Sequence, residues 1–187
     1  MATCALITAG VLSLYSYIAP LITDRAGLAT GVIPFALMAF GAGALVGNIV
    51  GGRLGDAHPY ATPFVTAGVS FLAWAGICAF SALPVALLAL FTLLGLVGLS
   101  ANPIMISLAL RFGGEAATLA AAMPTSIFNL GTAIGTGITS DLLGTSLGVL
   151  APAMVAVVFS APIFLPLTAL VLIERRSTSD GRATVTS

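Results

Sequence analysis

Apolar residues run along this chain in long blocks that charged side chains separate. The charge-free blocks are residues 1–23, 26–52, 57–110, 116–140 and 142–173. A helix needs about 20 apolar residues to cross the hydrocarbon core of a bilayer. The longest block has room for two crossings with a turn at 81–84, because Pro84 suits the first turn of a new helix. The pattern predicts six membrane-spanning helices, at 3–22, 32–53, 62–80, 84–110, 117–140 and 149–173.

These blocks are apolar on every side, which is typical of membrane helices and not of membrane strands. The strands of a β-barrel alternate polar and apolar residues, whereas residues 84–94 read Pro-Val-Ala-Leu-Leu-Ala-Leu-Phe-Thr-Leu-Leu. The expected fold class is an all-α membrane protein with six transmembrane helices. We expect residues 1–173 to form the bundle and the polar residues 174–187 to form a disordered cytoplasmic tail.

Composition excludes several classes of function. Hydrophobic residues make up 59% of the 187 residues and charged ones 6%, whereas about a quarter of a soluble domain is charged. The chain has no His-Glu-x-x-His, Gly-x-Ser-x-Gly or Walker motif. Its two cysteines lie in apolar blocks, and no basic patch suits a nucleic acid. We therefore expect the lipid bilayer as its surroundings, and no enzymatic activity, no cofactor, no metal and no nucleic-acid partner.

The arginines predict how the helices are oriented. With six crossings, one side of the membrane carries only Arg25. The other side carries Arg53, Arg111, Arg175, Arg176 and Arg182. Because cytoplasmic loops hold the excess of basic residues, both termini are expected in the cytoplasm, with the plasma (inner) membrane as the location.

Small residues recur at helical spacing in two of the predicted spans. Gly43, Gly47 and Gly51 lie on one face of the second helix, and Gly131 and Gly135 repeat the spacing in the fifth. In lipid, such faces let helix backbones approach closely. Tight packing is the plain interpretation, and a smooth face along which bundles rock or slide is the alternative.

Polar groups inside the predicted spans are few, and no ionisable group lies at mid-membrane. Intramembrane carboxylates and arginines mark ion or proton pathways, so the chain offers no protonation site of its own. Asn48, Asn102 and Asn129 either hydrogen-bond between helices or line a substrate path. Tyr15 and Tyr17 either belong to an interfacial aromatic belt or face a cavity.

Prolines inside the spans are expected to bend or interrupt helices around a cavity. They are Pro34, Pro103, Pro124, Pro152, Pro162 and Pro166.

The end of the second predicted helix carries a recognisable motif. Residues 52–56 read Gly-Arg-Leu-Gly-Asp and resemble the loop signature of the major facilitator superfamily, Gly-x-Leu-Ala-Asp-Arg-x-Gly-Arg-Arg. Gly52, Leu54 and Asp56 match that signature, and its basic part has no counterpart here. Such decay points to the copy of the signature in the C-terminal half.

Three further stretches resemble the bacterial drug and sugar efflux (arabinose-efflux-permease-like) branch of this family. Residues 15–24 look like its seventh helix and outer loop, and residues 128–135 look like its eleventh helix. Residues 102–115, which run from Asn102-Pro103 through Arg111 to Glu115, are similar to its tenth helix and inner loop.

The resemblance implies one half of a twelve-helix fold whose two halves surround a central cavity. It implies a secondary transporter that exports a drug, sugar or related metabolite by alternating access, as a proton-coupled antiporter. The chain would be the C-terminal half, inactive alone. A fragment of a longer protein is favoured, and pairing with a separate N-terminal half or with itself is the alternative. A non-transporting membrane scaffold or assembly module is the other class of function.

The resemblance also assigns roles to residues. The first, second, fourth and fifth helices would face the cavity, so Tyr15, Met38, Asn102 and Asn129 are the candidates for contact with a small-molecule substrate. Asp56 would accept hydrogen bonds at a neighbouring helix N-terminus and hold the cytoplasmic gate closed. A solvated loop carboxylate is the alternative for Asp56.

Overall fold

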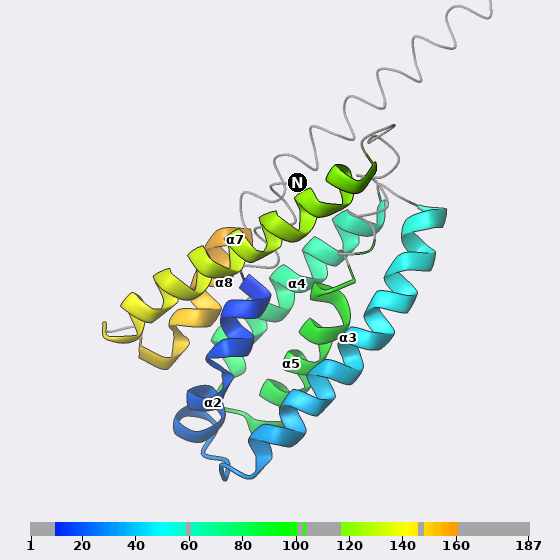
Figure 1. Ribbon diagram of the computed structural model, residues 1–187. Helices are drawn as coiled ribbons and strands as arrows, with labels where there is room; N and C mark the ends of the chain where they lie inside the picture. Colours follow the sequence, from blue (N-terminus) through cyan, green and yellow to red (C-terminus); the bar gives the residue numbers. More distant parts are fainter. Residues whose placement is uncertain (1–9, 59–60, 101–102, 104–116, 146–147, 161–187) are drawn as a thin grey trace, which may run out of the picture.

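A computed structural model describes residues 10–58, 61–100, 103, 117–145 and 148–160, and within these residues the chain is helical and has no strand (Figure 1). Residues 10–16 are helical and precede α2 (Ile18–Pro20) and a π-helical turn at Leu21–Arg25. The remaining elements are α3 (Val32–Ala57), α4 (Ala61–Phe80), α5 (Pro84–Gly98), α7 (Ala117–Leu143), a 3-10 turn (Gly148–Leu150) and α8 (Ala151–Ser160).

The first predicted helix, 3–22, is broken close to its end. The chain is helical from residue 10 to 16, turns at Tyr17 and resumes in α2. Pro20 accounts for the break, because it has no N–H for the carbonyl of Ser16 and its ring would clash with that carbonyl. Gly27, with φ at 65°, then turns the chain toward α3, a conformation that suits glycine.

Two of the prolines expected to bend helices do not do so. Pro34 lies in the first turn of α3 and Pro152 in the first turn of α8, where a helix N–H has no intrahelical partner and proline costs little. For these two the prediction is wrong. Pro124 lies inside α7, which continues from Ala117 to Leu143, and Pro162 and Pro166 lie outside the described residues.

The fourth predicted helix begins as expected and ends early. Pro84 starts α5 after the turn at 81–83. The prediction of one continuous helix over 84–110 is wrong, because α5 ends at Gly98. Pro103 gives the reason, since it has no N–H to donate to the carbonyl of Leu99.

Glycines bring the backbones of α3 and α5 into direct contact. Gly43 and Gly47 are buried on the face of α3 that meets α5. A Cβ atom on Gly43 would lie 2.8 Å from the carbonyl oxygen of Thr92, and one on Gly47 would overlap the backbone of Leu96. From the other side, a Cβ atom on Gly95 would overlap the carbonyl of Phe40. Only glycine fits at these positions.

The remaining helices complete the bundle around an apolar core. The core lies between α4, α5 and residues 10–22, with Leu14, Trp74 and Phe91 among its fully buried side chains. α4 packs against both α5 and α8, and α8 packs against α7 (Figure 1). Ser13 joins residues 10–16 to α7, since its hydroxyl lies 2.5 Å from that of Thr139 and donates to the carbonyl of Gly135 at 3.3 Å.

The exterior of the described helices is apolar. α3 and α4 are long and apolar enough to cross a membrane. Of the residues in an apolar 18-residue stretch of each helix, only 28% in α3 and 39% in α4 are buried. The core helix of a soluble protein would be mostly buried instead. Large exposed apolar surface in water invites association, whereas in a bilayer it faces lipid. The chain is therefore a helical membrane protein, and the count of six spans stays a prediction.

Candidate functional site

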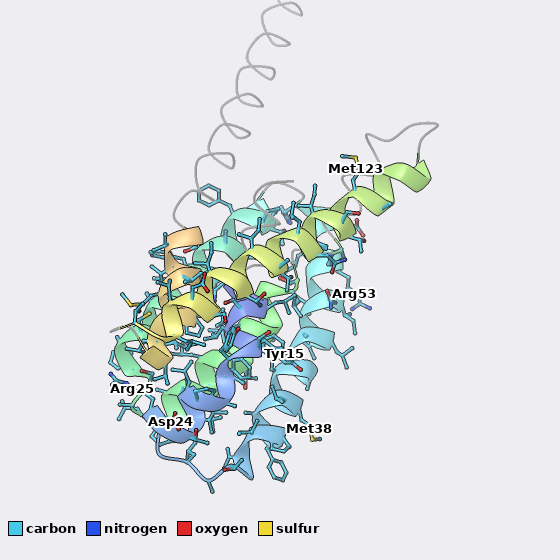
Figure 2. All side chains as sticks on the ribbon, turned by 60° about the vertical axis from the view of Figure 1, so that its left-hand side comes forward. Tyr15, Asp24, Arg25, Met38, Arg53 and Met123 are labelled. Atoms are coloured by element: carbon cyan, nitrogen blue, oxygen red, sulfur yellow. The ribbon has the colours of Figure 1, made fainter. Side chains whose placement is uncertain are left out.

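The structure describes three of the four substrate-cavity candidates, and Asn102 lies outside the described residues. Tyr15 lies toward the middle of the bundle, whereas Met38 points away from α3 and is 70% exposed (Figure 2). Asn129 lies on α7 and is exposed. Among the described residues, no hydrogen bond joins the three side chains or gives the Asn129 amide a partner.

Tyr15 is part of an aromatic cluster that three helices build. Its ring centroid lies 5.1 Å from that of Phe40 on α3 and 6.5 Å from that of Phe91 on α5. The two phenylalanine rings lie 4.8 Å apart, within the range in which aromatic pairs attract. Phe40 is 4% and Phe91 1% exposed, and Tyr15 is 38% exposed. The cluster therefore fixes the Tyr15 ring with one side on the core and the other side open.

The cluster lies about two turns into α3 and α5. Phe40 follows the start of α3 at Val32 by eight residues, or about 12 Å at 1.5 Å per residue. Phe91 follows the start of α5 at Pro84 by seven residues, or about 10 Å. The choice between an interfacial belt and a cavity for Tyr15 stays a prediction.

The surface of α7 has three different faces. Its buried face carries Gly131, Gly135 and Thr139 against residues 10–16. Its exposed side divides into an apolar face and a polar face. The apolar face carries Met123, Leu130, Ile134 and Ile138. The polar face carries Ser126, Asn129, Ser140 and the half-exposed Thr136. Exposed amides and hydroxyls are costly in hydrocarbon, so the polar face is suited to protein or water and the apolar face to lipid.

Hydrogen bonds join the first helix to α7, whereas Tyr15 contacts α3 and α5. The hydroxyl of Tyr17 donates to the carbonyl of Thr136 at 3.5 Å, next to the Ser13 contact with Thr139. We call Tyr15, Ser16, Asn129 and Thr136 the open polar face. The hydroxyl of Tyr15 has no hydrogen-bond partner among the described residues, so it is free for a ligand, for water or for another helix.

The charged groups lie at the ends of helices. Asp24 and Arg25 lie at one end of the bundle and Arg53 lies toward the opposite end of α3 (Figure 2). Arg25 donates through Nε to the Ser81 hydroxyl at 3.4 Å, which ties the turn after α2 to the turn before α5. The open polar face itself contains aromatic, amide and hydroxyl groups and no charge. Such a face suits an uncharged compound with an aromatic ring and hydrogen-bonding groups.

The loop signature lies in the last turns of a helix. α3 continues to Ala57, so Gly52, Leu54 and Asp56 are all helical, and the predicted end of this helix at 53 is too early. Thr62 explains the extension: its hydroxyl lies 3.0 Å from the carbonyl oxygen of Leu54 and 2.9 Å from that of His58. This contact satisfies the last carbonyls of α3.

Asp56 is exposed, and within the described residues no group donates a hydrogen bond to its carboxylate. Its gating role stays a prediction.

Sequence reasoning missed Phe40, Phe91 and Thr62. The two phenylalanines come from different helices and meet Tyr15 only in the folded bundle, so no spacing along one helix points to them. Thr62 had a signal, since a threonine in the first turn of α4 can reach the preceding helix end. In the part of the chain that is described, no three His, Cys, Asp or Glu side chains come together as a metal site.

Comparison with known proteins gives two relatives. No family model matches the chain, and no solved structure matches it. The chain is 32% identical over 148 residues to a chloramphenicol resistance protein of Streptomyces lividans, which covers 79% of this chain and 38% of that protein. It is 30% identical over 144 residues to YtbD of Bacillus subtilis (strain 168), an uncharacterised MFS-type transporter, which covers 72% of this chain and 36% of that protein.

The chain thus spans well under half the length of either relative. Both matches extend over most of its own residues. They confirm the resemblance, and with it the expectation that the chain is not an enzyme. The chain belongs to the major facilitator superfamily, in its drug-efflux branch.

Proposed function

We propose that the chain forms the C-terminal six-helix half of a secondary transporter that exports a small molecule by alternating access. The observation that carries the proposal is the open polar face, a set of uncharged polar side chains, Tyr15 among them, that are exposed or half-exposed on a mostly apolar membrane protein. Because the relatives are more than twice as long as the stretch they share with this chain, a second bundle is available in them to cover such a face. The substrate would bind between the two bundles, near the bilayer midplane.

In this proposal one half contributes to the substrate site and the other half carries the proton. This half supplies a fixed aromatic surface at Tyr15 together with the amide of Asn129, and it moves as a unit because glycines lock α3 to α5. The described part of the open polar face has no group that could carry a proton, and proton coupling needs one inside the membrane. We therefore assign the coupling carboxylate to the other half.

Chloramphenicol is the first compound to test, because one relative is named for resistance to it. It is a small uncharged aromatic compound with hydroxyl and amide groups, which fits the chemistry of the open polar face. The experiment is pH-gradient-driven chloramphenicol flux in proteoliposomes that hold this chain and the N-terminal half of the Streptomyces lividans relative. Saturable flux that an uncoupler abolishes supports the proposal, and absence of flux with every compound tried rejects it.

Replacing Tyr15 should weaken transport of an aromatic substrate. In the two-half proteoliposomes we expect Tyr15→Ala to lower chloramphenicol flux by about fivefold, because stacking on an aromatic side chain is worth about 1 kcal/mol. Tyr15→Phe should keep the stacking and lose only the hydroxyl. Met38→Ala is the matched control, since Met38 points away from the bundle. Equal flux for Tyr15→Ala and Met38→Ala would remove Tyr15 from the substrate path.

Cysteine labelling tests the proposed orientation, in which both termini are cytoplasmic. In a variant without Cys4 and Cys78, a cysteine at Ala29 should react with an impermeant maleimide added to intact cells, and one at His58 should not. Both positions are exposed in the structure, so access to the reagent decides the result. The opposite pattern would invert the topology, and labelling at both sites would contradict an odd number of crossings between them.

The buried glycines argue against the alternative of a membrane module that assembles with other proteins through its glycine faces. Gly43 and Gly47 already contact α5, and Gly51 contacts Ser100 just after it. Gly131 and Gly135 are buried on the side of α7 that faces residues 10–16. These faces are not free for a partner.

A further inference from the structure

A cavity of about 330 Å³ lies between α3, α4 and α5, near the turn that joins α3 to α4. Its size is at the lower end of the range for small-molecule sites. The walls include Val50 and Leu54 from α3, Val65 and Val69 from α4, and Leu96 and Val97 from α5. None of these residues belongs to the open polar face.

The packing of the three helices explains why a space remains. Gly47 holds α3 directly on the backbone of α5, Gly51 meets Ser100 just after the end of α5, and α4 also packs on α5. α3 and α4 meet at their joined ends, where Thr62 bonds to the carbonyls of Leu54 and His58. Leu96 and Val97 of α5 line the bottom of the gap between α3 and α4. Val50, Leu54 and Val65 at its sides are exposed, so in a bilayer the gap opens toward lipid.

The polar atoms of the cavity walls are already engaged. The hydroxyl of Thr62 donates to the carbonyls of Leu54 and His58. The hydroxyl of Thr66 donates to the carbonyl of Pro63 at 3.0 Å, and the hydroxyl of Ser100 donates to the carbonyl of Val97 at 2.6 Å. The space would hold about ten waters by liquid volume, and each water needs two to four polar partners. The walls do not offer them, so an apolar occupant fits better than water.

The end of the cavity nearest the turn has a different chemistry. His58 lines it and is exposed, and Arg53 lies five residues earlier on the same end of α3. Of these two residues only His58 lines the gap. Its imidazole and the exposed guanidinium of Arg53 can donate hydrogen bonds to a phosphate at this helix end, which also carries the exposed carboxylate of Asp56. The cavity and the adjacent helix end together therefore suit an amphiphile whose apolar chain lies between α3 and α4 and whose anionic head lies at the helix ends.

We infer that this cavity binds one acyl chain of an anionic phospholipid from the leaflet at the α3–α4 turn, with the phosphate near His58 and Arg53. The inference rests on the placement of α3 and α4 in a membrane and not on any transport activity. Leu54 is both a wall of the cavity and a residue of the loop signature. A bound chain therefore keeps α3 and α4 apart at the end where the signature lies.

Photo-cross-linking tests this site. The purified full chain is placed in nanodiscs that contain phosphatidylglycerol with a diazirine near the end of one acyl chain, irradiated and mapped by mass spectrometry. Because the label lies at the end of the chain that is far from the phosphate, we expect cross-links concentrated at the far end of the cavity, at Val50, Val69 and Leu96. Val69→Trp should fill the gap and abolish them. Leu72→Trp is the matched control, because Leu72 is exposed on the same helix and does not line the cavity.

Each outcome decides for or against the site. Cross-links spread evenly over the exposed residues of α3 and α4 would mean ordinary boundary lipid and would overturn the inference. Displacement of the label by a free fatty acid but not by unlabelled phosphatidylglycerol would overturn the choice of a phospholipid. If Val69→Trp does not fold, the cross-link map of the unchanged chain decides the question alone.

Discussion

Proteoliposomes that contain only this chain should show no chloramphenicol flux when a pH gradient is applied. Alternating access needs a substrate site enclosed by two bundles that rock against each other, and this chain leaves Tyr15 and Asn129 on an uncovered face. Adding the N-terminal half of a relative on a separate chain should raise the flux from background to a saturable level. The measurement is uptake of labelled chloramphenicol against time, with and without an uncoupler.

Two controls make this result specific. An unrelated six-helix membrane protein added in place of the N-terminal half should leave the flux at background. Saturable, gradient-dependent flux by this chain alone would contradict the half-transporter proposal and favour a carrier made of two copies of the chain.

The second large effect is expected at the contact between α3 and α5. Gly47→Ala adds a single methyl group, yet this group would overlap the backbone of Leu96, which cannot move aside as a flexible side chain can. The helices must separate instead. Overpacking of this kind costs about 1–3 kcal/mol, and we expect a loss of that size in the free energy of unfolding, measured by titration with a denaturing detergent.

Gly41 gives a matched control on the same helix. A Cβ atom there meets nothing within 4 Å, and alanine is a better helix former than glycine by about 1 kcal/mol. Gly41→Ala should therefore leave stability unchanged or raise it. Equal stabilities for the two variants would mean that the glycine face of α3 is not a packing surface.

The helix pattern could be predicted from the sequence where charge and proline mark the ends. The turn before Pro84 and the start of α3 at Val32 follow from local chemistry, and the structure has them where the pattern predicts. The break at Pro20 was missed. Pro103 was among the prolines expected to bend or interrupt a helix, but the predicted bounds 84–110 ran past the end of α5 at Gly98. In each case a proline leaves the carbonyl four residues earlier without a donor. The helix bounds were instead predicted from the lengths of the apolar blocks.

The candidate site was less accessible to sequence reasoning. Tyr15 was named because its stretch resembles a family motif, but the phenylalanines that fix its ring come from two other helices. Met38 was named on the same grounds and points away from the bundle. The side of a membrane helix that faces protein depends on its neighbours, and an apolar sequence suits both lipid and protein.

The glycine contact between α3 and α5 also has an entropic consequence. A glycine has no rotamers to lose when another helix covers it, whereas each leucine or isoleucine would lose about 0.5–1 kcal/mol of side-chain freedom. In a bilayer the helices are formed before they associate, and apolar attraction between them is weak. Almost no loss of side-chain entropy therefore offsets the dispersion contacts at Gly43 and Gly47. We expect α3 and α5 to be the last pair of helices to separate when the bundle is heated.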